Sequence, residues 1–211
     1  MPSWKSIITS LIIALPSSHA GAMTIPLFDE NGIKQWHEKT FSGTTHYQIT
    51  KDNNQPVLQA VSDDSASGLY YEQQLPISPT TTLEWSWKVA NTFPSIDETS
   101  KAGDDYPARI YVIVSDGPFF WQTHTLVYVW ASSQPTESRW PNAYTSNAVM
   151  WAVDSGDKQL NRWISHSRNL QQDLKTAFGK TYQQIEAIAI MSDSDNSKNR
   201  STAWYGNICL K

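Results

Sequence analysis

Seven residues near the middle of the chain constrain the fold most strongly. From residue 83 to residue 89 the sequence LEWSWKV alternates large apolar residues with polar ones. A period of two places Trp85 and Trp87 on one face of a β-strand and Glu84 on the opposite, solvent-facing side. This segment therefore predicts a sheet strand with one buried face.

Other segments repeat the strand pattern as short apolar or aromatic runs separated by polar turns. One helix is predicted over 169–178, because Leu170, Leu174 and Phe178 recur at helical spacing, and Gly179 then supplies a left-handed stop. Many short strands and one short helix predict a mainly β fold, a two-sheet antiparallel jelly-roll-type β-sandwich. The further strands are expected over 57–61, 68–73, 109–115, 125–131, 148–153, 185–191 and 202–210.

The first 22 residues have the order of an export signal. Lys5 supplies a positive charge, residues 7–15 (IITSLIIAL) are apolar, and small residues precede Ala20 and Ala22 at the spacing that signal peptidase accepts. We expect cleavage after Ala20 or Ala22, followed by a single β-sandwich domain over 23–211. The apolar run is shorter than the roughly 20 residues that span a bilayer, so no transmembrane segment is expected.

Composition predicts a periplasmic protein. The only cysteine is Cys209, so no intrachain disulfide can form, and a domain of this length can bury a sufficient core without one. Removing the signal takes away Lys5 and makes the formal net charge one unit more negative than −4. No cluster of Lys and Arg occurs, so no nucleic-acid partner is expected, and a protein partner stays unknown.

Four segments carry a resemblance to a known family: LEWSWKV at 83–89, KAGDD to RIYV over 101–112, MSDSDN at 191–196 and WYGNI at 204–208. Together they resemble the bacterial domain-of-unknown-function family 3047. The resemblance implies a β-sandwich similar in shape to galactose-binding-like carbohydrate modules, and fold alone does not fix function. Where that family commonly has Asp before the final isoleucine, this chain has Asn207, which removes one metal-binding charge.

An acidic pair beside an arginine is the first candidate site. Asp104 and Asp105 end a long polar stretch, and Arg109 begins the next predicted strand. One interpretation is a salt-bridged loop anchor. The other is a ligand site in which a carboxylate accepts hydrogen bonds from sugar hydroxyls and Arg109 orients the acid.

A second acidic group follows the predicted strand at 185–191. Asp193 and Asp195 alternate at the end of this strand and could offer oxygen ligands to a structural Ca²⁺. The spacing lacks the glycine and glutamate of an EF-hand, so that motif is excluded. A plain Asp/Asn-rich turn is the alternative.

Loop aromatics give the clearest functional signal. Ten tryptophans and nine tyrosines occur in the chain, and the loops after Gly117 and around Pro141 hold several of them. Aromatic rings suit stacking against the apolar C–H faces of sugars. The alternative is that these rings close the ends of the sandwich core. The candidate ligand residues are Trp121, Trp140, Asn142 and Tyr144, together with Asp104, Asp105 and Arg109.

Three functions remain open from the sequence. A periplasmic binding or accessory module for a saccharide or similar polar ligand ranks first, and an envelope interaction protein without a small ligand ranks second. A glycan-active hydrolase or lyase would need two carboxyls facing each other at about 5–10 Å, which a sequence cannot show. No catalytic residue is assigned, because the histidines lack metal-ligand spacing and no serine lies in a nucleophile-elbow context.

Overall fold

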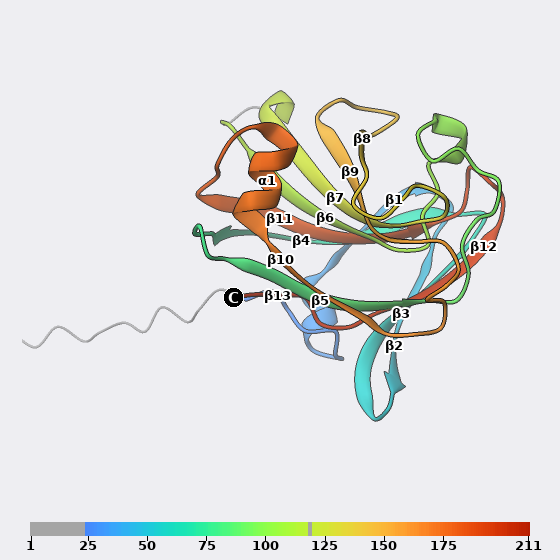
Figure 1. Ribbon diagram of the computed structural model, residues 1–211. Coiled ribbons are helices and arrows are strands. Elements are labelled where there is room, and N and C mark those ends of the chain that lie inside the picture. Colours follow the sequence, from blue (N-terminus) through green and yellow to red (C-terminus); the bar gives the residue numbers. More distant parts are fainter. Residues whose placement is uncertain (1–23, 118–119) are drawn as a thin grey trace, which may run out of the picture.

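The computed structural model describes residues 24–117 and 120–211. They form two β-sheets packed face to face, with one α-helix at the margin (Figure 1). The predicted β-sandwich is confirmed. The predicted export signal lies outside the described residues. In the described part of the chain, no helix has the length and apolar composition needed to cross a membrane.

The seven-stranded sheet has the spatial order β1-β4-β11-β6-β7-β9-β8. Its pairs are antiparallel except β7 and β9, which run parallel. After β7 the chain forms the edge strand β8 and then returns as β9. Because β8 lies on the outer side of β9, β9 lies next to β7 and runs parallel to it, which differs from the antiparallel pairing that we expected. The strands are β1 (His37–Ser42), β4 (Ala66–Pro76), β6 (Arg109–Ser115), β7 (Thr123–Ala131), β8 (Arg139–Pro141), β9 (Ala148–Ser155) and β11 (Gln184–Asp193).

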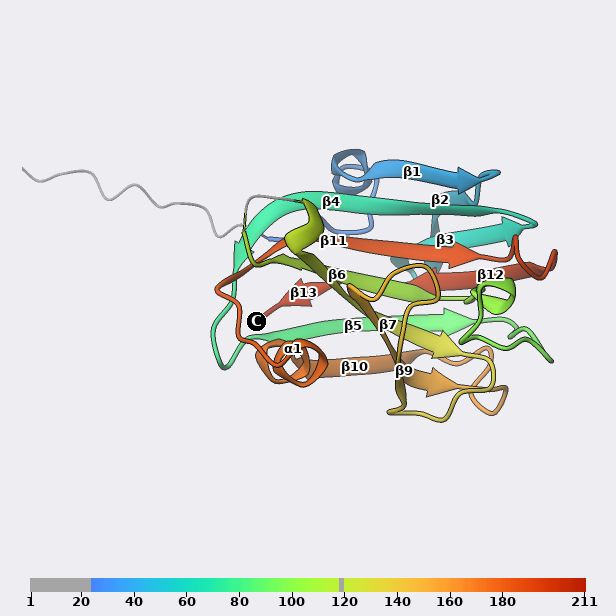
Figure 2. The same cartoon turned by 90° about the horizontal axis from the view of Figure 1, so that it is seen from above.

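The six-stranded sheet has the order β10-β5-β12-β3-β2, and a short strand, β13, also pairs with β5. All of its pairs are antiparallel. Figure 2 shows the strands of both sheets running in similar directions. The strands are β2 (His46–Asp52), β3 (Gln55–Asp63), β5 (Thr82–Val89), β10 (Ile164–Asn169), β12 (Arg200–Tyr205) and β13 (Cys209–Leu210).

The main core lies between the two sheets. Trp85 and Trp87 on β5 are buried, as their alternation predicts, and they face Tyr128 and Trp130 on β7. The rings of Trp85 and Tyr128 are stacked with centroids 5.0 Å apart. Aromatic packing of this kind stabilises the sandwich by removing large apolar areas from water.

A second, smaller core lies on the outer face of the seven-stranded sheet. Val127 and Val129 alternate with the inward-facing residues of β7, so they point away from the main core. Tyr106 and Trp140 pack on them. The connection that carries Tyr106 and the side chain of Trp140 on the edge strand β8 therefore cover part of this face, and polar residues nearby become buried.

The predicted helix is confirmed as α1 (Leu170–Phe178). Its N-cap is Asn169, whose side chain accepts a hydrogen bond from the backbone N–H of Gln172, and Gly179 ends it at φ 72°. Within residues 24–117 and 120–211 there are also three short 3₁₀ turns: η1 (Gly32–Gln35), η2 (Lys101–Gly103) and η3 (Phe120–Gln122).

Candidate functional site

The start of β6 and the end of β11 bring an arginine and several carboxylates together. Arg109 pairs in register with Met191, so Asp193 lies two residues further along the neighbouring strand. The Arg109 guanidinium forms an ion pair with Asp193, and its Nη1 lies 3.6 Å from Oδ2 of Asp104. Arg109 and Asp193 are only 3% and 2% exposed. This ion pair is therefore shielded from water.

Asp105 holds the connection between β11 and β12. Its two carboxylate oxygens accept hydrogen bonds from the backbone N–H groups of Asn196, at 3.1 Å, and Ser197, at 2.6 Å. The Asp105 side chain is fully buried. A buried carboxylate that satisfies backbone donors of a distant loop fixes that loop in place. In this structure Asp105 thus has the contacts of a loop anchor.

The acidic cluster, defined as Asp104, Asp105, Asp193 and Asp195 around Arg109, holds more negative than positive charge. Oxygen atoms of Asp105, Asp193 and Asp195 all lie within 4.8 Å of one another. Burial raises the pKa of Asp193, and Asp105 and Asp104 raise it further while Arg109 opposes the shift. Burial also raises the pKa values of Asp104 and Asp195. Ionising every carboxyl of this cluster therefore costs free energy unless another cation is bound.

The same geometry bears on the hydrolase hypothesis. The carboxyl oxygens of Asp105 and Asp193 are closer together than the roughly 5–10 Å between the acid and base of a glycosidase. Both side chains are buried under the connections that cover the sheet. A glycan at the protein surface cannot contact either carboxylate in this arrangement.

Above the cluster, a polar and aromatic surface surrounds Tyr144. Asn142 donates a hydrogen bond to Asp104 at 3.3 Å, and its side-chain oxygen accepts one from the Tyr144 backbone N–H at 3.0 Å. The Tyr144 hydroxyl donates to the Lys101 carbonyl at 3.3 Å and accepts from the Asn196 side chain at 3.4 Å. The Tyr144 side chain is nevertheless 57% exposed. The buried cluster thus positions an exposed ring.

The other predicted aromatics occupy different environments. Trp121 is 58% exposed, and its carbonyl accepts a hydrogen bond at 3.3 Å from Asn147, in the same loop as Tyr144. Trp140 is only 9% exposed and packs in the second core. The structure therefore brings Asn142, Tyr144 and Asn196 together, joins their surroundings to the Trp121 turn through Asn147, and places Trp140 in the second core. We call Trp121, Asn142, Tyr144 and Asn196 the loop surface.

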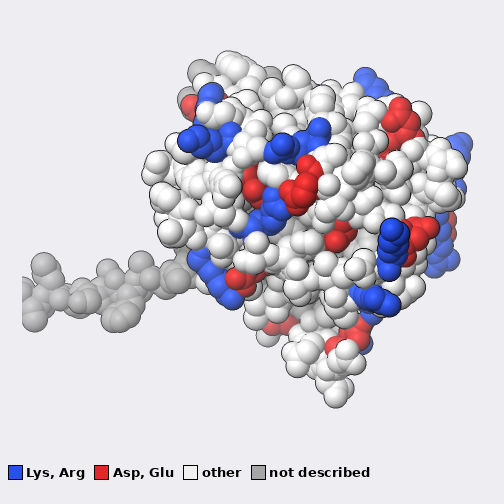
Figure 3. Space-filling model, viewed as in Figure 1, with Lys and Arg blue, Asp and Glu red and all other residues white. Residues whose placement is uncertain are grey.

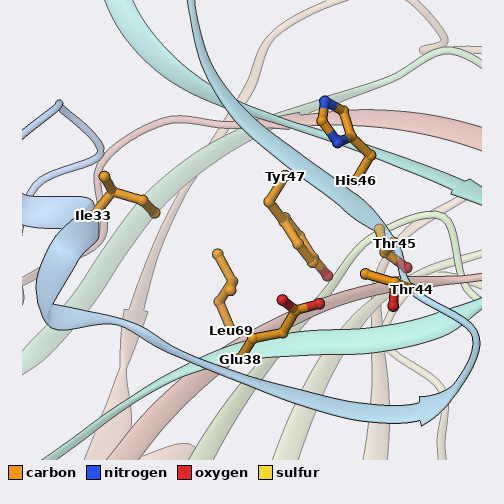
Figure 4. Close-up of a pocket in the computed structure, with 7 residues that line it drawn as sticks. All are labelled: Ile33, Glu38, Thr44, Thr45, His46, Tyr47 and Leu69. Atoms are coloured by element: carbon orange, nitrogen blue, oxygen red, sulfur yellow. The ribbon is translucent and has the colours of Figure 1, made fainter.

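A cavity of about 480 Å³ lies elsewhere, between β1 and β2, which are the edge strands of the two sheets. In Figure 4 the carboxylate of Glu38 and the hydroxyl of Tyr47 point toward each other, and the His46 ring points away from them. Both groups bind Ser67: its hydroxyl donates to Glu38 at 3.0 Å, and its carbonyl accepts from Tyr47 at 2.7 Å. No sequence pattern marks this cavity, because its lining residues come from several separate segments, among them the wholly exposed strand β1.

Charged side chains on the surface are interspersed rather than segregated. Figure 3 shows basic groups beside acidic groups on the face in view. Several oppositely charged side chains of the described residues form ion pairs, which reduces the local net charge. The surface pairs are Lys88–Asp52, Arg168–Glu137, Lys180–Asp116 and Lys211–Glu84.

The architecture defines a two-sheet β-sandwich protein. A family model described as "Protein of unknown function (DUF3047)" matches residues 34–209. The chain therefore belongs to this family, as the four sequence segments indicate. No curated protein matches the sequence.

Solved structures with a similar fold include carbohydrate-binding proteins. The family 11 carbohydrate-binding module from Clostridium thermocellum, in complex with a β-1,3-1,4-mixed-linked tetrasaccharide, is 13% identical; the match covers 89% of this chain and 94% of that one, with a TM-score of 0.43. The Emp47p carbohydrate recognition domain is 10% identical, covering 90% and 95%, with a TM-score of 0.47. TmCBM61 in complex with β-1,4-galactotriose is 9% identical, covering 90% and 97%, with a TM-score of 0.42. At these identities the likeness concerns the fold alone.

Proposed function

We propose that this protein is an exported periplasmic module that binds a glycan or a similar polar ligand at the loop surface. The observation that carries the proposal is the exposure of Trp121 and Tyr144 on two loops joined by a hydrogen bond. Exposed rings of this size favour stacking on sugar faces, and the amides of Asn142 and Asn196 lie beside Tyr144, where they could bind hydroxyl groups. The role is binding, and it needs no pair of accessible carboxylates.

Single replacements of Tyr144 and Trp121 by alanine test this proposal. Each is expected to weaken glycan binding about threefold to tenfold, because an aromatic stacking contact is worth about 0.5–1.5 kcal/mol beyond its buried area. Binding is measured by titration calorimetry and by native electrophoresis in gels that contain soluble polysaccharides. The matched control is Phe41→Ala, because Phe41 is an exposed aromatic residue, 66% accessible, on the edge strand β1.

Two results would contradict the loop surface as the binding site. Unchanged affinity in both Tyr144→Ala and Trp121→Ala would place binding elsewhere on the protein. An absence of binding by the wild-type protein across glucans, galactans, xylans and peptidoglycan fragments would instead favour an envelope interaction protein without a small ligand.

The export of the protein, which is part of this proposal, can be tested separately. We expect the protein in a periplasmic extract to begin at residue 21 or residue 23, because the small residues before Ala20 and Ala22 fit signal peptidase. Mass spectrometry of the intact purified protein measures the mass lost. A protein that keeps Met1 in the cytoplasmic fraction would contradict the assignment.

We also propose that a structural Ca²⁺ binds at Asp193 and Asp195, with Asp105 as a third ligand. Oxygens within 4.8 Å of one another can share one ion, since Ca²⁺ binds oxygen at about 2.3–2.6 Å. Bound Ca²⁺ would offset the negative charge that the cluster holds in excess of Arg109. The ion would hold the β11–β12 connection through Asp105 and thereby support Asn196 of the loop surface.

A further inference from the structure

The outer face of the six-stranded sheet carries a second group of aromatic and polar residues. Strand register aligns them in one row: Trp204 on β12 pairs with Lys88 on β5 and with Gln59 on β3, and Gln59 pairs with Gln48 on β2. Trp163 immediately precedes β10, whose first residue pairs with Trp87. The row therefore crosses the whole width of the sheet, on the opposite side of the sandwich from the loop surface (Figures 1 and 2).

The centre of this row is a lysine between two indole rings. The Lys88 ammonium lies 4.5 Å from the ring centroid of Trp204 and 5.3 Å from that of Trp163. Both rings are partly exposed. Cation–π contacts with Lys88 fix the orientation of the two indoles, so the rings are already ordered before any ligand arrives.

Asp52 completes the arrangement from the β2–β3 hairpin. Its Oδ2 forms an ion pair with Lys88 and accepts a hydrogen bond from the Trp163 indole N–H at 3.0 Å. These two hydrogen bonds lower the pKa of Asp52, with the larger effect from Lys88. The hairpin therefore bends over this face, and the Lys88 and Asp52 charges cancel. The tryptophan face, meaning Trp163, Trp204, Lys88, Asp52, Gln48 and Gln59, has no net charge.

The chemistry of this face fits an uncharged glycan chain. Indole rings pack on the apolar faces of sugars, while the amides of Gln48 and Gln59, which bond each other at 2.6 Å, can exchange that bond for sugar hydroxyls. Trp163 and Trp204 stand two strand spacings apart, about 9.6 Å, comparable with a disaccharide unit of an extended chain. A strongly anionic ligand would find only the one paired lysine.

We propose that the tryptophan face binds the backbone of an uncharged glycan, as a second surface that is independent of the loop surface. This inference rests on the proposed function, from which it takes the class of ligand, a glycan. It places the binding of that glycan at a different set of residues. Two surfaces on opposite sides of one sandwich would let a single domain contact two chains of a polymer, or two segments of one chain, and so increase retention by avidity.

The test compares variants of the two surfaces in the mature protein. Trp204→Ala and Trp163→Ala are expected to weaken retention in gels containing mixed-linkage β-glucan, β-1,4-galactan or xylan tenfold or more. Trp204→Phe, which keeps an aromatic ring, should weaken it less. Tyr144→Ala should leave the retention that Trp163 and Trp204 provide unchanged. Unchanged circular dichroism and melting temperature show that each variant is folded.

A second readout separates ligand contact from a structural role. In protein labelled with 5-fluorotryptophan, the fluorine signals of Trp163 and Trp204, assigned by their absence in the two alanine variants, should shift when the same glycans are added. The signal of the buried Trp130 serves as the internal control.

The outcomes distinguish the two proposals. Loss of retention in the Trp204 and Trp163 variants, with or without an additional loss in Tyr144→Ala, supports the tryptophan face. Loss in Tyr144→Ala alone, with static Trp163 and Trp204 signals, overturns the tryptophan face and leaves the proposed function standing. An absence of wild-type retention on every polysaccharide overturns both.

Discussion

Replacing Asp193 with alanine is expected to lower the free energy of unfolding by about 3–5 kcal/mol, because it leaves a buried arginine without its nearest counter-ion. Arg109 is 3% exposed and cannot turn toward solvent. The change also removes the acceptor for the backbone N–H of Tyr106, which lies 3.1 Å from Asp193 Oδ1. Urea denaturation followed by circular dichroism and by tryptophan fluorescence measures the loss.

Two further variants make this expectation specific. Asp193→Asn keeps an acceptor for the Tyr106 backbone N–H but removes the charge. It should therefore lower the free energy of unfolding less than Asp193→Ala does. Asp63→Ala removes an exposed carboxylate on β3 and should change stability by no more than about 0.5 kcal/mol. A loss below about 1 kcal/mol in Asp193→Ala would show that water reaches Arg109, contrary to the burial of the cluster.

Without Ca²⁺, the acidic cluster is expected to lose stability as the pH rises from about 4 toward neutrality. The pKa values of Asp104, Asp193 and Asp195 are raised in the folded state, chiefly by burial. Groups of this kind stabilise the fold fully below their unfolded pKa, and this contribution disappears as the pH passes through the raised, folded pKa. Saturating Ca²⁺ should reverse the loss, because binding at 100 times Kd adds about 2.7 kcal/mol.

The measurement is the difference between melting temperatures with Ca²⁺ and with a chelator, taken across the pH range. A difference is needed because the pKa values of Asp116 and Glu137 are lowered, so these groups contribute the opposite slope. Asp195→Asn should reduce both the rise in melting temperature on adding Ca²⁺ and the change of melting temperature with pH in chelator. The control variant Asp63→Asn should change neither quantity. Equal melting temperatures with Ca²⁺, Mg²⁺ and chelator at neutral pH would contradict the cation site.

Sequence reasoning performs well where a pattern is local. The alternation around Trp85 and Trp87 predicts β5 and its buried face, and the spacing of Leu170 and Leu174 predicts α1 with its cap at Gly179. It misses β1, β2, β8 and β10. All six residues of β1 are exposed, so this edge strand shows no alternation of apolar and polar residues. The parallel β7–β9 pair is also hidden, since it depends on which side of β9 the short β8 occupies.

The candidate sites depend on contacts between distant parts of the chain. Aspartates can be recognised as candidates in the sequence, but Arg109 and Asp193 are 84 residues apart and meet only because β6 and β11 are neighbours. The tryptophan face was missed for the same reason. Trp163, Lys88 and Trp204 belong to three separate segments, and only the register of β5 and β12 aligns them.

The order of the strands has a consequence for how the chain folds. β11 lies between β4 and β6, and β12 lies between β5 and β3, so an interior position in each sheet is filled by one of the last strands to be synthesised. Neither sheet can close while residues 184–205 are missing. Such high contact order predicts slow, all-or-none folding. We therefore expect a chain that still lacks these residues to remain incompletely folded while it emerges from the ribosome.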